Sequence, residues 1–363
     1  MKRALCVILA ALFLAAGLSG CGYPELYERI LIHGIGVDWE GGEYLVTVRS
    51  STSAEEGEEL FTCQGPTVLE ALSSLSLSTG REPFYSHNYL VVFGMGCARR
   101  GLGDCLDFFV RYYNTRPTVK LFLAAGTAQE VLSIEKDSQL MRMSELQALG
   151  GSGRYNGQAV DMDILRFIND SKREGGAPVL PLLQAEEDGV EVVGTAYFER
   201  SQVKGVLDSE QTRGYLAAVG WLERGELAVS LEDAGTATLS LRSAESKITS
   251  RAEGTPSFQV EIQVEADLSA ADFAPGPDAS RTQLESAAAR QLTDNAVSAI
   301  QQAVERDRCD IFGFGDLLYR RSPGVWRDMA ADWQNQMAQS QFSVEVSVTL
   351  RRLEEENEGS LLS

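Results

Sequence analysis

FQVEIQVEADL, at residues 258–268, alternates apolar and polar side chains at almost every position, and FSVEVSVTL, at residues 342–350, does the same. Successive side chains of a β-strand point to opposite faces, so this alternation predicts a sheet with one buried and one solvated face. Sheets of this kind are usually antiparallel. The two segments therefore decide the fold of the C-terminal half.

A long amphipathic helix is predicted between these strands, from about Thr282 to Glu305. Its apolar residues recur at every fourth position, which places them on one helical face. This row consists of Leu284, Ala288, Leu292, Ala296, Ile300 and Val304. A helix of that length measures about 36 Å. We expect it to lie across the buried face of the sheet.

The C-terminal half begins with a predicted hairpin, formed by strands at 192–198 and 202–207. Asp208 or Ser209 then provides the N-cap of a short helix. Together these elements predict an α+β fold with several domains, in which sheets are mixed or antiparallel and helices pack on one face.

The N-terminal half alternates strands and helices. Strands at 30–38 and 44–48 flank Gly41-Gly42 and predict a hairpin. A helix near 67–77, a strand at 89–93, a helix containing Leu102 and Leu106, and a strand at 119–124 follow. This alternation is typical of a mixed α/β layer.

Composition divides the chain into four parts. Residues 1–20 form a signal peptide that is cleaved, and residues 356–363 form an acidic tail. Prolines at 178 and 181 and the acidic turn at 186–189 mark a break between the halves. We therefore predict an N-terminal α/β domain over 21–190, with an optional subdivision near 130, and a C-terminal α+β domain over 191–355.

The N-terminus has the three parts of an export signal. Lys2 and Arg3 precede an apolar stretch over 4–17, which is shorter than the roughly 20 residues needed to cross a bilayer. Leu-Ser-Gly then precedes Cys21, as in a bacterial lipoprotein signal. Cys21 is accordingly the predicted lipid attachment site. The alternatives are a plain secretory signal with a chance cysteine and an N-terminal anchor that is never cleaved.

A lipid on Cys21 explains how such an acidic chain is held at a membrane. A diacylglyceryl group supplies two acyl chains, which stable anchoring requires. The segment from Cys21 to Ile30 spans at most about 30 Å, so the first domain must lie close to the bilayer. Without Lys2 and Arg3 the chain has 30 basic and 52 acidic residues, a net charge of −22. That charge disfavours nucleic acid and anionic lipid head groups as partners.

The remaining cysteines show no paired spacing of a zinc site or redox motif. They are Cys63, Cys97, Cys105 and Cys309. Export permits disulfides, and Cys97 with Cys105 is a conceivable pair. Buried free thiols are the favoured interpretation, because unpaired cysteine behaves as a small apolar residue.

Catalytic chemistry has few candidates. His33 and His87 are the only histidines, so a zinc site or a Ser-His-Asp triad would need one of them. The sequence has no H-E-x-x-H, G-x-S-x-G or G-x-x-x-x-G-K-[ST] motif. Asp161 and Asp163 precede an apolar run and fit a helix start better than a metal site, which would need more oxygen ligands. We therefore predict no enzyme activity, no cofactor and no metal.

DIFGFGDLLYRR at 310–321 closely resembles the C-terminal signature of the Ger(x)C family, the lipoprotein C subunits of spore germinant receptors. The resemblance continues through Pro323, Trp326, Trp333 and the strand at 342–351. GIGVD at 34–38, Ser86-His87, GTAYF at 194–198 and GVL at 205–207 also fit. The likeness covers Cys21 to about Arg352. One departure is Gly22-Tyr23-Pro24, where members often have a Trp and charged residues.

The resemblance implies a multidomain α+β protein without catalytic chemistry in the inner membrane of a dormant spore. Its implied partners are a multi-spanning permease-like subunit and a larger subunit with soluble and membrane parts. Together these subunits sense nutrients and trigger germination. The alternative functions are a solute-binding lipoprotein that delivers a small molecule to a transporter and, less favoured, an envelope hydrolase.

Two features of the signature have alternative interpretations. Gly313 and Gly315 resemble half of a dinucleotide fingerprint, but a third glycine is missing, so a structural role at the end of the long helix is favoured. Several aromatic residues form either a partner-facing patch or, as we prefer, a small core that closes the second domain. They are Phe312, Phe314, Tyr319, Trp326 and Trp333.

Overall fold

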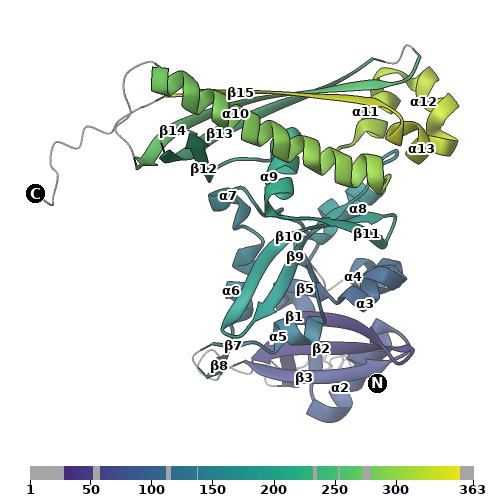
Figure 1. Cartoon of the computed structure of the whole chain (residues 1–363). Helices are drawn as coiled ribbons and strands as arrows, with labels where there is room; N and C mark the ends of the chain where they lie inside the picture. The colour runs from purple at the N-terminus through teal and green to yellow at the C-terminus, as the bar shows by residue number, and fades with distance from the viewer. Residues whose placement is uncertain are drawn as a thin grey trace, which may run out of the picture.

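The computed structural model describes residues 28–51, 58–111, 116–136, 138–231, 235–251, 254–272 and 279–351. Figure 1 shows an elongated molecule with one sheet towards the N-terminal end and a second, longer sheet at the other end. This multidomain α+β arrangement of mixed sheets and helices confirms the predicted fold class. Among the described residues, no helix has both the length and the apolar character that crossing a bilayer requires.

The first sheet contains nine strands in the described part of the chain. They are β1 (Arg29–Glu40), β2 (Glu43–Ser51), β3 (Glu59–Gly65), β4 (Glu82–Phe84), β5 (Leu90–Phe93), β6 (Lys120–Ala124), β9 (Val179–Glu186), β10 (Gly189–Glu199) and β11 (Gln202–Leu207). Their order is β11-β10-β9-β6-β5-β1-β2-β3, and β4 pairs with the start of β1. The central pairs are parallel and the pairs towards both edges are antiparallel. A two-stranded sheet of β7 (Glu135–Lys136) and β8 (Gln139–Leu140) lies apart.

Helices cover both faces of this first sheet. They are α2 (Val68–Thr79), η2 (Tyr85–His87), α3 (Met95–Arg100), α4 (Gly103–Arg111), α5 (Ala128–Leu132), α6 (Met143–Leu149), α7 (Gly153–Asn156) and α8 (Ile164–Ser171). All four residues of β5 are buried: Leu90 and Val92 pack with α5 and α6, while Val91 and Phe93 belong to the larger core. The continuous apolar run in β5 follows from this burial on both faces.

The predicted elements of the N-terminal half are confirmed. β1 and β2 form the hairpin, and Gly41 and Gly42 adopt φ of 59° and 94° in its turn. Two positive φ values in succession explain the paired glycines, because other residues resist this conformation. The division near 190 falls inside β10, which pairs with both β9 and β11 in one sheet. The domain limits 21–190 and 191–355 stay a prediction.

The second sheet has four strands among the described residues, in the order β12-β13-β14-β15. They are β12 (Gly225–Leu231), β13 (Gly235–Arg251), β14 (Ser257–Ala271) and β15 (Gln341–Leu350). The two alternating segments are neighbours, and they run parallel, with Phe258 opposite Phe342 and Ala266 opposite Leu350. The antiparallel expectation is therefore wrong for this pair, although it holds for β12 with β13 and β13 with β14.

Helices pack on one face of this second sheet. They are α9 (Ser209–Ala218), α10 (Ala279–Ile300), the π-helix η3 (Gln301–Arg306), α11 (Phe314–Arg321), α12 (Pro323–Met329), η4 (Ala330–Asp332) and α13 (Trp333–Ala338). The predicted apolar row of the long helix is buried from Leu284 to Val304, and Figure 1 shows α10 lying across the strands. α9 approaches α10 so closely that a Cβ at Gly214 would lie 2.3 Å from the backbone of Asn295.

The predicted N-caps at Asp163 and Asp208 are confirmed. Asp163 caps α8 by accepting a hydrogen bond of 2.8 Å from the backbone of Arg166. Asp208 forms a capping box with Gln211 at the start of α9. The helix-start prediction is wrong for Asp161, which precedes the N-cap of α8 and forms an ion pair with Lys120.

The cysteines within the described ranges are buried free thiols, as favoured from the sequence. A hydrogen bond between Cys97 and Cys105, together with burial, raises the pKa of the Cys97 thiol. A raised pKa keeps a thiol protonated and unreactive.

Candidate functional site

The predicted site residues do not converge on one centre. Cys21 lies outside the described residues. His33 lies in β1 and His87 in η2, so the two histidines belong to different elements. The His33 ring packs against Tyr89 with 5.3 Å between centroids, and the His87 ring packs against Phe84 with 5.9 Å. Within the described ranges, no group of three or more His, Cys, Asp or Glu residues could hold a metal ion.

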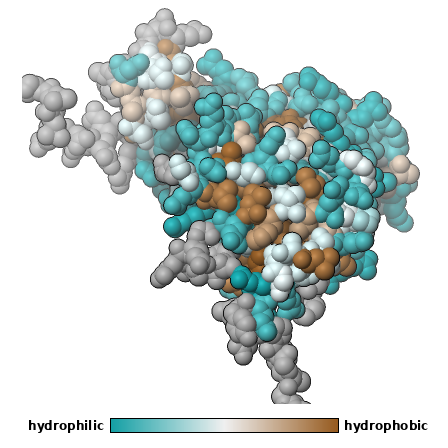
Figure 2. Space-filling view, turned by 90° about the horizontal axis from the view of Figure 1, so that it is seen from below, coloured by the Kyte–Doolittle hydropathy of each residue, from teal (hydrophilic) through white to brown (hydrophobic). Residues whose placement is uncertain are grey.

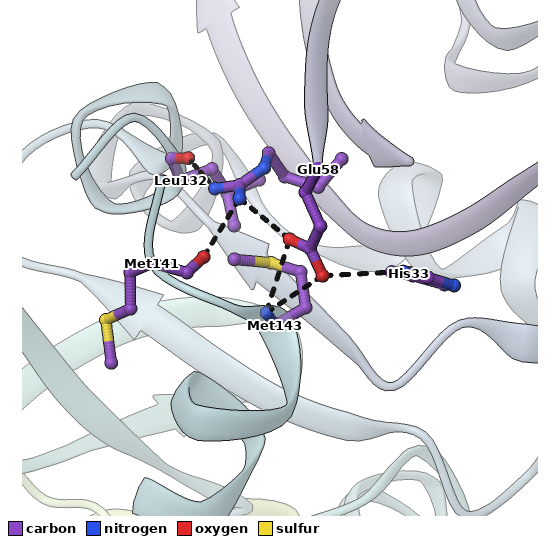
Figure 3. Close-up of polar contacts among 6 residues, drawn as sticks. His33, Glu58, Leu132, Met141 and Met143 are labelled. Atoms are coloured by element: carbon purple, nitrogen blue, oxygen red, sulfur yellow. Dashed lines mark hydrogen bonds and ion pairs between the residues drawn. The ribbon is translucent and has the colours of Figure 1, made fainter. Parts of the chain in front are cut away.

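A buried ion pair that sequence analysis missed links the hairpin to the helices beside it (Figure 3). The side chain of Arg49, at the end of β2, is fully buried and donates to Glu58 Oε2 at 2.7 Å. Arg49 also donates to the carbonyl oxygens of Leu132 at 2.6 Å and Met141 at 2.9 Å. Burial lowers the pKa of Arg49, an effect that the neighbouring Glu58 opposes.

Glu58 joins three segments of the chain. Besides Arg49, it accepts hydrogen bonds of 3.2 and 3.3 Å from the backbone N–H of Met143, where α6 begins. His33 Nδ1 lies 3.4 Å from Glu58 Oε1. The arrangement gives His33 a structural partner, as predicted from its place in an apolar strand. Through these contacts Arg49, Glu58 and His33 connect β1, β2 and the start of α6.

Asp38 has a similar structural role in the GIGVD motif. Its carboxylate accepts hydrogen bonds of 2.8 Å from Ala128 N–H and 2.9 Å from Gln129 N–H at the start of α5. A Cβ at Gly94 would lie 1.8 Å from Asp38 Oδ1, so glycine is required there. Burial raises the pKa of Asp38, although the two backbone hydrogen bonds favour its charged form.

The C-terminal signature is built around the buried carboxylate of Asp310. Oδ1 accepts a hydrogen bond of 2.9 Å from Phe314 N–H, and Oδ2 accepts bonds of 2.7 Å from Gly315 N–H and 3.1 Å from Trp333 Nε1. Gly313 adopts a φ of 77°, which turns the chain into α11. Burial raises the pKa of Asp310 to about 6 against the effect of these hydrogen bonds.

The signature aromatics form a small core, which was the preferred prediction. Phe312, Phe314, Trp326 and Trp333 are buried, whereas Tyr319 is 48% exposed. Phe314 packs against Phe258 of β14 at 4.6 Å and Phe342 of β15 at 5.1 Å between ring centroids. The partner-facing interpretation is therefore wrong for the four buried rings. These rings attach α11 and α13 to the parallel pair of strands.

A cavity of about 280 Å³ opens beside the Asp310 loop. Its lining includes Asp170, Arg173, Tyr215, Trp221, Asp310 and Phe312. The Asp170 carboxylate pairs with Arg173 at 3.2 Å, and burial raises the pKa of Asp170. Charged groups beside aromatic walls could hold a small polar solute, although the volume is below the range usual for ligand pockets.

Both halves of the chain match domain models of spore germination proteins. Residues 22–185 match the model for the spore germination protein N-terminal domain, and residues 193–354 match the model described as spore germination B3/GerAC like, C-terminal. Spore germination protein KC of Bacillus subtilis (strain 168) is 21% identical over 324 residues, which cover 81% of this chain and 78% of that protein.

A solved structure shares the fold. The crystal structure of the GerBC protein matches with a TM-score of 0.63 and 16% sequence identity, covering 88% of this chain and 97% of that one. At this low identity the likeness establishes the fold alone.

We expect Glu58→Ala to lower the free energy of unfolding by about 3–5 kcal/mol, because it leaves the buried Arg49 guanidinium without its counter-charge. Urea unfolding followed by circular dichroism measures the change. The matched control is Arg320→Ala, which removes the exposed partner of the Asp316 ion pair and should cost about 1 kcal/mol or less. An equal loss of unfolding free energy in both variants would show that the Arg49–Glu58 ion pair contributes no more than an exposed one.

We also expect the stability contribution of Asp310 to depend on pH. Because its pKa is about 6 in the folded protein and 3.8 as the reference value, the folded state holds a proton that the unfolded state loses. The stabilisation is fully present below pH 3.8 and is lost as pH rises through 6, by roughly 3 kcal/mol in total.

The stability difference between the native chain and Asp310→Asn should therefore shrink between about pH 4 and pH 6.5. Urea unfolding at several pH values measures it. The exposed Asp188→Asn removes the same charge from a turn and serves as the control. A difference that stays constant with pH would show that the carboxyl pKa is not raised.

Proposed function

The chain belongs to the GerAC-like family of spore germination proteins, and from this premise we propose that it is a lipid-anchored, non-enzymatic subunit of a nutrient germinant receptor. The observation that carries the proposal is the tandem match to both family domains, which together span residues 22–354 with a gap of only seven residues. We place the protein at the outer face of the spore inner membrane.

Cys21 is proposed as the anchor. The N-terminal family match begins at Gly22, directly after the cysteine that follows the Leu-Ser-Gly sequence. This start supports a mature chain that begins with the lipid-bearing residue. Two acyl chains on one cysteine would hold the protein stably at the bilayer, while its net charge keeps most of its surface away from anionic head groups.

A subunit role agrees with the chemistry of the described residues. Four charged groups that are buried or nearly so, Asp38, Arg49, Glu58 and Asp310, each make contacts that hold elements together. We propose that the protein acts through its surfaces, with a multi-spanning permease-like subunit and a larger membrane subunit as its partners. The proposed domains over 21–190 and 191–355 would present separate surfaces to them.

A solute-binding lipoprotein is the second candidate, and the cavity beside Asp310 is the observation that favours it. In that case the protein would deliver a small polar molecule to a transporter. The two functions predict different partners in the membrane: receptor subunits in the first case and transporter components in the second.

Replacement of the lipid acceptor, Cys21→Ala, should move the protein from the membrane fraction to the soluble fraction and leave its circular dichroism spectrum unchanged. The matched control is Cys6→Ala, which changes a cysteine within the signal and keeps the lipid acceptor. Fractionation and immunoblotting measure the distribution. Retention of Cys21→Ala at the membrane would show that protein contacts, and not the lipid, localise the chain.

The complex itself is tested by purification of the tagged, lipidated chain from detergent-solubilised dormant-spore inner membranes. We expect mass spectrometry to identify a multi-spanning permease-like protein and a larger membrane subunit, which are absent from an untagged control. Recovery of transporter ATPase components in their place would favour the solute-binding function and overturn the receptor proposal.

A further inference from the structure

One end of the molecule carries a segment that is almost free of charge. Residues 60–80 contain one charged side chain, Glu70, although charged residues make up 23% of the whole chain. This segment forms most of β3 and all of α2. β3 is an edge strand of the first sheet, a position that proteins commonly protect with charges. The scarcity of charged side chains in β3 and α2 indicates that part of their surface is covered by something other than water.

α2 exposes apolar residues on the side that faces away from the core. Val68, Ala71, Leu72 and Leu75 are buried, whereas Leu69 is 52% and Leu77 is 88% exposed. The two exposed leucines lie eight residues apart on one side of the helix, which also carries the exposed Glu70. The helix α4, which contacts α2, exposes Val110 to 55%. Figure 2 views this end of the molecule and shows apolar side chains gathered in its middle with polar ones around them.

The hydroxyl groups of α2 are already satisfied within the helix. Ser73 donates to Leu69 O at 2.7 Å, Ser76 to Ser73 O at 2.8 Å, and Thr79 to Leu75 O at 2.8 Å. Ser74 and Ser78 donate to backbone carbonyls of the same helix. Internal hydrogen bonds lower the cost of moving a hydroxyl out of water, because the group does not lose its only partner. α2 is therefore suited to a partly apolar surrounding.

A groove of about 610 Å³ continues this face between α2 and α4. Its lining includes the apolar side chains of Tyr44, Leu69 and Phe108. Two acidic and two basic residues also line it, so their charges cancel: Asp104, Asp107, Arg100 and Arg111. Asp107 and Arg111 form an ion pair with each other, so they add no net charge.

The face lies close to the start of the mature chain. Arg29 of β1 pairs with Glu82 of β4, five residues after Leu77. Cys21 precedes Arg29 by eight residues, so a lipid on Cys21 would lie within about 28 Å of Arg29, which pairs with the segment that follows α2. α2 has 12 residues and is about 18 Å long, which suits a helix lying in the plane of a membrane surface.

We propose that the α2 face, defined by Leu69, Ser73 and Leu77 of α2 with Val110 of α4, docks on the bilayer and fixes the orientation of the protein. The occupant is a zwitterionic lipid surface, since a face with little net charge on a strongly acidic protein matches best the head groups that carry no net charge. The proposal rests on the proposed lipid anchor at Cys21, which brings this face within reach of the membrane.

The test uses the full lipidated chain on phosphatidylcholine vesicles. An environment-sensitive fluorophore is attached at Leu77→Cys and, as the matched control, at Tyr155→Cys, which is 77% exposed in α7. The native cysteines in the described part of the mature chain are buried and should not react. We expect a blue shift, a severalfold rise in emission and quenching by spin-labelled lipid for the label at 77, with water-like emission at 155.

A second measurement uses the unlipidated Cys21→Ala chain, whose weak binding to the same vesicles is followed by co-sedimentation. Leu69→Ser with Leu77→Ser should lower the partition coefficient roughly tenfold. The control pair Tyr155→Ser with Leu165→Ser changes exposed residues of α7 and α8 and should leave the coefficient unchanged.

The outcomes separate this inference from the proposed function. Failure of the lipidated chain to float with vesicles would overturn the anchor. Flotation with water-like emission at both labels would overturn the docking of α2 and leave the anchor standing. Protection of the label at 77 only when a membrane-spanning partner is present would assign the face to a protein subunit and overturn the bilayer as its occupant.

Discussion

β14 and β15 run parallel in register, and the C-terminal half of the molecule depends on this pairing. Parallel neighbours cannot be joined by a tight turn, so the chain must return along the whole sheet before the second strand begins. α10 provides this return and buries its apolar row against the strands. The signature helices α11 to α13 then complete the connection at the end of the sheet where β15 starts. Phe314 packs between Phe258 and Phe342, the first aromatic residues of the two strands.

Buried carboxylates organise the backbone around the two motifs on which the family resemblance rests, GIGVD at 34–38 and the C-terminal signature at 310–321. Asp38 accepts hydrogen bonds from the start of α5, and Asp310 does so from the start of α11. Removing a carboxylate from water is unfavourable, as the raised pKa of Asp310 shows, and several hydrogen bonds offset that cost. These motifs consequently define the architecture.

The distribution of charge adds to this picture. The full chain has a net charge of −20, yet the segment 60–80, which forms α2 and most of β3, contains one charged side chain. A lipid at Cys21 and a docking face at α2 would restrain the protein at two points. A protein held in this way presents a fixed orientation to neighbouring membrane subunits, whereas a single flexible tether would not.

Patterns within short segments determined much of this structure. Alternation in 258–268 and 342–350, the four-residue row of α10, the glycine turn at 41–42 and the caps at Asp163 and Asp208 are local, because each depends on backbone geometry over a few residues. The predicted signal at 1–20 and the family signature are local in the same sense.

The contacts between distant segments were decided only by the tertiary structure. No local pattern marks Arg49 as a buried residue, and the sequence does not distinguish Glu58 from Glu55, Glu56 and Glu59 around it. Their pairing depends on Leu132, Met141 and Met143, which lie more than 70 residues further along the chain. The parallel direction of β15 and the buried environment of Asp310 arise in the same way. Alternation fixes which face of a strand is buried, but it carries no information about its neighbour, which the packing of the whole chain selects.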